Sequence, residues 1–138
     1  MITPHSKMKR VFYRLRGTKI GAHVGIGTGV FLEDYDPHLI TINDNVDIGP
    51  FVIIATHDSS KKCVYPDGKI ETKEVVIENN VYIGSGAIIL PGVRIGHHSI
   101  VGAGSVVTKD IPPYSVSYGI PAKVQKTTDE KRIINGEI

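Results

Sequence analysis

The segment Thr56-His57-Asp58 contains the side chains of this sequence that are best suited to proton transfer. It follows the apolar run Val52–Ala55, at the point where the sequence turns polar. A neutral imidazole can take a proton from an attacking hydroxyl or amine near neutral pH, which is the task of a general base. Asp58 or a backbone carbonyl could hold the required tautomer, although Asp58 could equally be a solvated acid. His57 is therefore a candidate base whose role depends on the elements that position it.

Those elements repeat every six residues. Six consecutive hexads begin at Ile77 and read IENNVY, IGSGAI, ILPGVR, IGHHSI, VGAGSV and VTKDIP. The same pattern starts upstream at Ile20, Ile26, Ile42, Ile48 and Ile54. Strand alternation turns the first and fifth residues of a hexad inward and the sixth outward, while the central glycines permit a corner. Three sides would close a coil of about 18 residues, and stacked coils would pair their strands in parallel and bury each other's apolar residues.

A long insertion interrupts the repeat three residues after His57. The hexad at Ile54 predicts another at residue 60, but the next one begins at Ile77, so residues 60–76 (SKKCVYPDGKIETKEVV) are inserted. Pro66-Asp67-Gly68 is a strong turn signal, and a long insertion in a compact repeat is more often functional than accidental. We therefore expect a long extruded loop over residues 60–76, with His57 beneath it beside a cleft. A smaller slip of the repeat lies within residues 32–39. The other five histidines are expected to be solvated and inert: His5, His23, His38, His97 and His98.

The segments outside the repeat are expected to belong to the same single domain, residues 1–138. Residues 3–16 carry apolar side chains at helical spacing, which predicts a capping helix within residues 1–17 over the open end of the stacked coils. Its basic residues leave contact with RNA or a membrane surface as a less favoured alternative. The repeat region spans residues 18–126, and residues 127–138 form a tail without repeats, predicted as a short helix or a mobile segment.

The composition favours a cytoplasmic globular protein. The chain has 138 residues and a net charge of +2, so no strong electrostatic field favours nucleic acid as a partner. It has one cysteine, Cys63, which excludes an internal disulfide. No apolar run reaches the roughly 20 residues that a membrane helix needs, and no apolar segment of a secretory signal follows the basic N-terminus. Cys63 as a nucleophile would need an activating base nearby, and we expect it to play no such role.

Three long motifs carry a resemblance to a known family. They are VYIGSGAIILPGVRIG from Val81, VGAGSVVTKDIPP from Val101 and GIPAK from Gly119. On these motifs the chain resembles the hexapeptide-repeat acyltransferases, and most of all the branch that acetylates sugars and xenobiotics. The resemblance implies an all-β, left-handed parallel β-helix, which is an exception to the right-handed crossover rule. It also implies acetyl-CoA as the acyl donor, no required metal, and direct transfer to a hydroxyl or amine of a sugar or polysaccharide precursor. His57 matches the Thr-His corner where the family keeps its general base.

The resemblance implies contacts with acetyl-CoA at six positions: Ser85, Ala103, Thr108, Lys109, Lys123 and Lys126. Ser85 would lie near the thioester, where a hydroxyl or amide could stabilise the developing oxyanion. Ala103 would lie along the pantetheine arm, and the other four near the adenine and phosphates. The family often has Arg at the last two positions, whereas Lys offers a point charge without the bidentate fork. Each of these positions has an alternative to cofactor binding. Ser85 and Ala103 could simply pack at corners, and the lysines could be solvated surface charges.

The acceptor side departs from the family pattern. Relatives that acetylate sugars carry an Asn-Phe-Asn motif, but the corresponding region here reads VFLED, residues 30–34. Asp34 or Asp36 could replace the missing Asn, and Tyr82 stands where the family often has Trp. The residues expected near the acceptor are Asp58, Tyr82 and Asp34. The identity of the acceptor, and whether O- or N-acetylation occurs, stay open at this point.

The outward positions of the hexads favour assembly. Tyr82 and Ile100 stack on one predicted side, and Ile88 and Val106 stack on a second. A monomer would expose both apolar pairs to water, so we expect other subunits to cover them. The resemblance implies a homotrimer with active sites between neighbouring subunits.

Two other functions fit a β-helix of this kind. A zinc carbonic anhydrase needs three convergent histidines, two of them five residues apart, and none of the six histidines here has that spacing. A non-catalytic β-helix scaffold is the other alternative. The Thr-His corner and the GIPAK segment argue against the scaffold.

Overall fold

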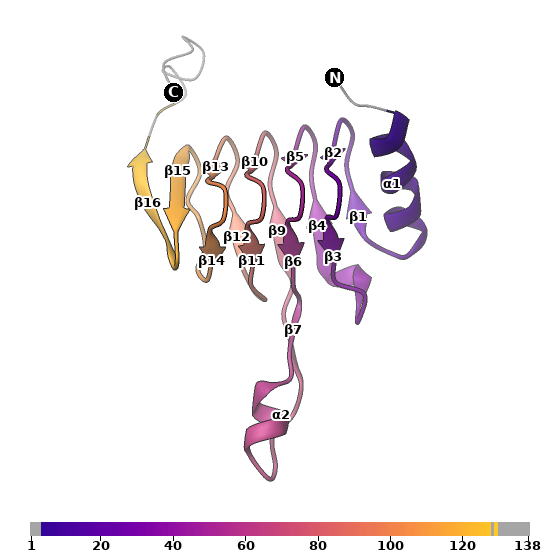
Figure 1. Cartoon of the computed structure of the whole chain (residues 1–138), viewed down its shortest axis with the longest axis vertical. Helices are drawn as coiled ribbons and strands as arrows, with labels where there is room; N and C mark the ends of the chain where they lie inside the picture. Colours follow the sequence, from indigo (N-terminus) through magenta and orange to yellow (C-terminus); the bar gives the residue numbers. More distant parts are fainter. Residues whose placement is uncertain (1–3, 128, 130–138) are drawn as a thin grey trace.

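The computed structural model describes residues 4–127 and 129, and it shows a triangular prism of short stacked strands (Figure 1). Side A holds β1 (Lys19–Ile20), β4 (Ile40–Ile42), β9 (Val75–Ile77) and β12 (Arg94–Ile95). Side B holds β2 (Gly25–Ile26), β5 (Asp47–Ile48), β10 (Tyr82–Ile83), β13 (Ile100–Val101) and β15 (Ser115–Gly119). Side C holds β3 (Phe31–Leu32), β6 (Ile53–Ile54), β11 (Ile88–Ile89) and β14 (Val106–Val107). These strands pair in parallel, so the predicted left-handed parallel β-helix is confirmed.

The interior of the prism follows the hexad pattern. Ile83 is fully buried and lies in register between Ile48 and Val101, whereas its outward neighbour Tyr82 is 45% exposed. The first residues of the hexads from Ile77 to Val107 are buried, and so are the fifth residues. Where a serine takes the fifth place, its hydroxyl donates to the backbone, as Ser105 does to the Gly102 carbonyl at 2.7 Å. Ser99 and Ser105 are tolerated inside the prism because their hydroxyls are hydrogen-bonded.

The corner between sides A and B has a continuous row of side chains. Five stacked corner residues have φ between 54° and 58°: His23, Asn45, Asn80, His98 and Tyr114. The side-chain amide of Asn45 donates from Nδ2 to Asn80 Oδ1 at 2.6 Å, and Asn80 Nδ2 lies 3.1 Å from His98 Nε2. The rings of His98 and Tyr114 stack with 5.1 Å between their centres. The expectation that His98 is freely solvated is therefore wrong, because its ring is part of this row.

An acid at the same corner makes stability depend on pH. Glu78 accepts from the Arg94 guanidinium at 2.6 Å and from the His97 amide at 2.9 Å. Partial burial raises the pKa of Glu78, but these hydrogen bonds outweigh burial and hold the pKa below its ordinary value. Such a carboxylate stabilises the fold above its unfolded-state pKa, and this contribution is lost as the pH falls through the folded-state pKa.

We expect Glu78→Gln to remove this pH-dependent contribution to the free energy of unfolding. At neutral pH the variant should lose about 1 kcal/mol of unfolding free energy, the usual worth of such a hydrogen-bonded group. Below about pH 4, near and under the ordinary pKa of a glutamic acid, the difference from wild type should shrink. Urea unfolding at neutral pH and near pH 3 measures both differences. A difference in unfolding free energy that stays equally large near pH 3 would contradict this role of the Glu78 carboxylate.

The insertion forms an arm that projects away from the prism (Figure 1). Its stem is an antiparallel pair, β7 (His57–Asp58) with β8 (Glu71–Thr72), and α2 (Ser60–Val64) lies near its tip. A salt bridge of 2.6 Å from Lys61 to Glu71 ties α2 to the stem. The arm therefore begins at His57 rather than at residue 60. Val75 and Val76 belong to side A, where Val75 is fully buried, so the predicted range of 60–76 is shifted.

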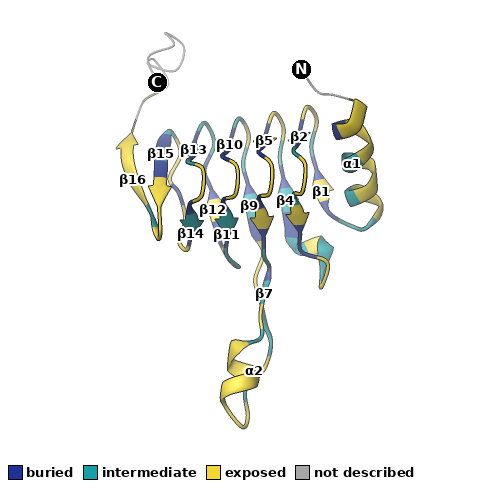
Figure 2. Cartoon of the chain, in the orientation of Figure 1, coloured by how far each residue is buried: buried dark blue, intermediate teal, exposed yellow. Residues whose placement is uncertain are grey.

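The helix α1 (Pro4–Leu15) covers the N-terminal end of the prism (Figure 1), as the predicted cap should. Its contacts with the prism are mainly polar. Lys9 Nζ donates to Gly27 O at 2.7 Å, Tyr13 Oη to Val30 O at 2.8 Å, and Arg14 Nη2 to Ile20 O at 2.7 Å. The first coil has no preceding coil to bond its carbonyls, and these side chains supply the donors instead. Figure 2 shows the outer surface of α1 largely exposed.

The C-terminal end of the prism closes differently from the prediction. β15 continues side B in parallel, but β16 (Ala122–Thr127) folds back on β15 as an antiparallel strand after a cis Ile120–Pro121 peptide bond. The coil thus ends near residue 119 rather than 126. Elsewhere, the smaller slip of the repeat within residues 32–39 contains the 3-10 helix η1 (Pro37–Leu39). Of the predicted tail, residues 128 and 130–138 lie outside the described residues.

Candidate active site

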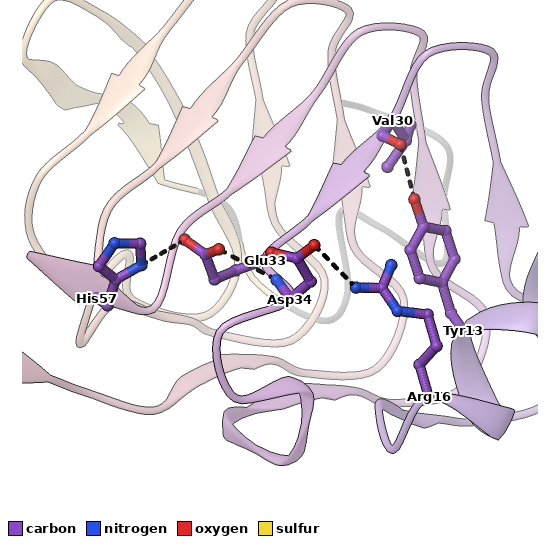
Figure 3. A network of polar contacts seen from close by, with 6 residues as sticks. All are labelled: Tyr13, Arg16, Val30, Glu33, Asp34 and His57. Atoms are coloured by element: carbon purple, nitrogen blue, oxygen red, sulfur yellow. Dashed lines mark hydrogen bonds and ion pairs between the residues drawn. The ribbon is translucent and has the colours of Figure 1, made fainter.

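The imidazole of His57 is paired with a buried glutamate. Glu33 follows β3 directly, and His57 lies three residues after the end of β6. These two strands are adjacent on side C and bring both residues to the C–A corner, where Glu33 N donates to Ile54 O at 3.0 Å. The distance from Glu33 Oε2 to His57 Nδ1 is 2.7 Å (Figure 3). The Glu33 side chain is 8% exposed and the His57 side chain 31% exposed. The carboxylate is thus enclosed, while the imidazole still reaches solvent.

This pairing selects one tautomer of His57. A carboxylate can only accept, so Nδ1 carries the proton that it donates to Glu33, and Nε2 keeps its lone pair. The ring of Tyr35 stacks on the imidazole with 5.0 Å between ring centres and 26° between planes. The arrangement presents Nε2 as a proton acceptor at the base of the arm.

Asp58 does not hold the tautomer of His57, contrary to the prediction, because the Nδ1 contact is made by Glu33 and Asp58 has another partner. Its carboxylate accepts from the Ser60 amide at 2.8 Å, at the exposed start of the arm. The hydrogen bonds from Ser60 hold the pKa of Asp58 below its ordinary value. The role foreseen for Asp58 or a backbone carbonyl belongs to Glu33. A signal was present in the sequence, because both breaks in the repeat, at 32–39 and after His57, occur at the same corner on neighbouring coils.

The candidates for the missing asparagine have partners of their own, and Figure 3 shows those of Asp34. Asp34 Oδ2 lies 3.3 Å from Arg16 Nη2, and the Asp34 amide donates to Glu33 Oε1 at 3.0 Å. Asp36 accepts from the His38 amide at 3.1 Å and so caps η1. Arg16 therefore connects the end of α1 to the segment that holds Glu33 against His57.

Two of the expected cofactor residues stack at the B–C corner. Ser85 and Ala103 are exposed at equivalent places of successive coils, and Gly104 N donates to Ser85 O at 2.9 Å. Beside them Gly86 and Gly104 have φ of 70° and 68°, and a Cβ added to either would meet nothing within 4 Å. This corner therefore exposes an open strip of backbone.

The other expected site residues lie elsewhere in the chain. Thr108 and Lys109 are exposed at the C–A corner after β14, and Lys123 and Lys126 are exposed on β16. Tyr82 lies on side B, opposite the corner that carries His57. One chain alone therefore does not bring Tyr82, Ser85 or β16 to His57. Across residues 4–127 and 129, no three His, Cys, Asp or Glu side chains gather as a metal site.

Comparisons with known proteins agree with this architecture. Residues 74–109 match the family model described as bacterial transferase hexapeptide (six repeats). The galactoside O-acetyltransferase of Lactococcus lactis subsp. lactis (strain IL1403) is 42% identical over 118 residues, which cover 80% of this chain and 56% of that protein. The chain thus spans a little over half the length of the curated relatives that it matches first.

Solved structures extend the likeness to most of both chains. A galactoside acetyltransferase in complex with coenzyme A has a TM-score of 0.70 and 28% identity, covering 95% of this chain and 76% of that chain. The maltose O-acetyltransferase from Clostridium difficile 630 has a TM-score of 0.66 and 31% identity, covering 94% of this chain and 80% of that chain. With the repeat, the prism and the Thr-His corner, these likenesses place the chain in the hexapeptide-repeat acyltransferase family, in the branch of the galactoside and maltose O-acetyltransferases.

Proposed function

We propose that this protein transfers the acetyl group of acetyl-CoA to a hydroxyl of a sugar or polysaccharide precursor, or to an amine, with His57 as general base. The observation that carries the proposal is the 2.7 Å contact of His57 Nδ1 with the buried Glu33 carboxylate, which leaves Nε2 as the basic nitrogen. Relatives named galactoside and maltose O-acetyltransferases support the acceptor class, and the neighbour in complex with coenzyme A supports the donor.

The reaction needs no covalent enzyme intermediate. His57 Nε2 takes the acceptor proton as the acceptor oxygen or nitrogen attacks the thioester carbonyl. The oxyanion collapses, the carbon–sulfur bond breaks, and the imidazolium returns its proton to the departing thiolate. One new bond to carbon forms, one carbon–sulfur bond is lost, and free CoA leaves. Glu33 stabilises the imidazolium that exists between these two proton transfers.

The distribution of the other candidates supports a site shared between chains of a homotrimer. Side C exposes Phe31 at 43% and Ile53 at 38%, with Ile88 and Val106 half-buried beside them. A partner covering this side would remove apolar surface from water. It would also bring its own cofactor corner, with Ser85 and Ala103, toward His57. In this arrangement Asp34, Asp58 and Tyr82 are the proposed acceptor contacts, and Thr108, Lys109, Lys123 and Lys126 hold the nucleotide end of CoA.

The experiment is a screen for acceptor-dependent release of CoA. The protein is mixed with acetyl-CoA and a panel of simple glycosides, nucleotide-linked sugars and amines, and the free thiol is followed with time. At least one sugar acceptor should raise release well above hydrolysis, with kcat on the order of 1–10³ per second for a good acceptor, and mass spectrometry should show an acetylated product. Folded protein that releases no CoA with any acceptor class would contradict the proposal.

A further inference from the structure

The outer face of α1 is an apolar stripe in contact with solvent. Met8, Val11, Phe12 and Leu15 are 64%, 55%, 56% and 83% exposed. Their spacing puts all four on one face of the helix. The opposite face carries the donors to the first coil described above. A surface helix normally buries its apolar face against its own domain, so this inverted orientation leaves a face for an outside partner.

Positive charge borders this stripe. At 100° per residue, the exposed Lys7 lies along one edge of the stripe and His5 along the other. Just beyond the helix, the guanidinium of Arg16, which pairs with Asp34, lies 5.5 Å from the ring centre of Phe12. The helix sequence PHSKMKRVFYRL contains no acidic residue. A partner that fits must therefore offer an apolar interior with negative charge around it. An anionic lipid surface has this combination of properties, and basic amphipathic helices of this kind bind such surfaces.

The apolar surface continues into a groove beside the helix. Met8 and Phe12 line it together with Gly29 and Val30, and its volume is about 380 Å³. Lys9 and Tyr13 also line it, and both donate to backbone carbonyls of the first coil. The stripe and the groove together make one apolar area at the end of the prism.

The position of α1 keeps this area free in the proposed assembly. The helix lies across the N-terminal end of the prism, whereas the proposed subunit contacts use its sides (Figure 1). Association through the sides leaves the ends uncovered, so the stripe is not explained by that interface.

We propose that α1 docks on the surface of an anionic lipid bilayer. Met8, Val11, Phe12 and Leu15 enter the acyl-chain boundary, and Lys7 meets the lipid phosphates. With 12 residues the helix is shorter than a bilayer is thick, so it lies in the interface. Within the described part of the chain, no helix meets the length and hydropathy needed to cross a membrane. The proposal does not depend on acyl transfer.

Vesicle flotation with the full chain tests the proposal. Vesicles of phosphatidylcholine with about one third phosphatidylglycerol should carry the protein upward, and vesicles of phosphatidylcholine alone should do so about tenfold more weakly. Raising the salt from about 0.1 M to about 0.5 M should reduce the binding to the anionic vesicles.

Two variants separate the apolar from the charged contribution. Val11→Ser with Leu15→Ser should weaken binding about 30-fold or more. Lys7→Glu should weaken binding to anionic vesicles about tenfold and leave binding to neutral vesicles unchanged. The matched control is Val64→Ser with Tyr65→Ser, which removes apolar residues that are 70% and 61% exposed on the arm and should bind as wild type does. All these positions are exposed, and unchanged thermal unfolding will confirm that each variant is folded.

Three results would overturn the proposal. One is binding of wild type to anionic vesicles that is no stronger than to neutral ones. Another is a stripe variant that floats as well as wild type. The third concerns sedimentation without vesicles: wild type sediments as an assembly, and the variant with Val11→Ser and Leu15→Ser sediments as a smaller species. That result would mean that a second copy of the chain covers the stripe.

Discussion

Replacing His57 with alanine is expected to lower kcat for acetyl transfer by about 10²–10⁴-fold, the usual contribution of a general base. The loss follows from the geometry, because Nε2 is the nitrogen of this imidazole that Glu33 does not engage. The KM for acetyl-CoA should change little, since most of the proposed cofactor contacts lie at the B–C corner and on β16. Thr108 and Lys109 share the corner of His57 but follow β14, two strands away on side C. Thiol release at saturating acetyl-CoA, with the best acceptor from the screen, measures both quantities.

The matched control for His57 is His97→Ala. His97 is also a half-buried histidine, but it lies at the A–B corner, where its ring contacts Tyr114. That variant should keep its turnover even where it loses stability. If His57→Ala retains kcat within about threefold of wild type, His57 is not the base, because a general base contributes far more than this.

Replacing Glu33 with glutamine is expected to cost at least about tenfold in kcat, because the amide can hold the wrong tautomer. A glutamine nitrogen facing Nδ1 donates to it and moves the imidazole proton to Nε2, where the base must be free. Glu33→Ala should be impaired as well, since nothing then orients the ring except Tyr35. The unfolding free energy of Glu33→Gln need not fall, because the variant no longer buries a charge.

Glu78→Gln is the matched control for Glu33→Gln. The two glutamates undergo the same substitution, and both accept hydrogen bonds from a basic side chain and from a backbone amide. We expect the Glu78 variant to lose stability at neutral pH and keep its activity, and the Glu33 variant to show the reverse. Equal activity losses in both variants would indicate a general effect of the substitution and not a role in orienting His57.

The fold could be predicted from the sequence because the hexad pattern is redundant. Each inward position is specified by its own residue and again by the residues stacked above and below it, as with Ile48, Ile83 and Val101. The residues at which the arm begins and ends were less predictable than the fold. Stem pairing of His57 with Thr72 and burial of Val75 both depend on contacts across the insertion, which the local period does not specify.

The candidate site was predictable in part. The Thr-His corner singled out His57, but its partner Glu33 comes from the neighbouring coil, 24 residues earlier in the sequence. Periodicity likewise predicted α1 but not which of its faces meets the prism. The free carbonyls of the first coil decide that, because they attract the polar face that carries Lys9 and Tyr13. Contacts of this kind depend on unpaired backbone groups, which a hydrophobic pattern does not reveal.

The measurement that tests the account most directly is a double-mutant cycle on kcat/KM with Glu33→Gln, His57→Ala and the two combined. If Glu33 acts through His57, the Glu33 substitution costs at least about tenfold in the wild-type background and less than about twofold in the His57→Ala background, because residues that act as a unit are not additive. If the two losses multiply, Glu33 and His57 work independently, and the account of a glutamate that orients the catalytic imidazole is wrong.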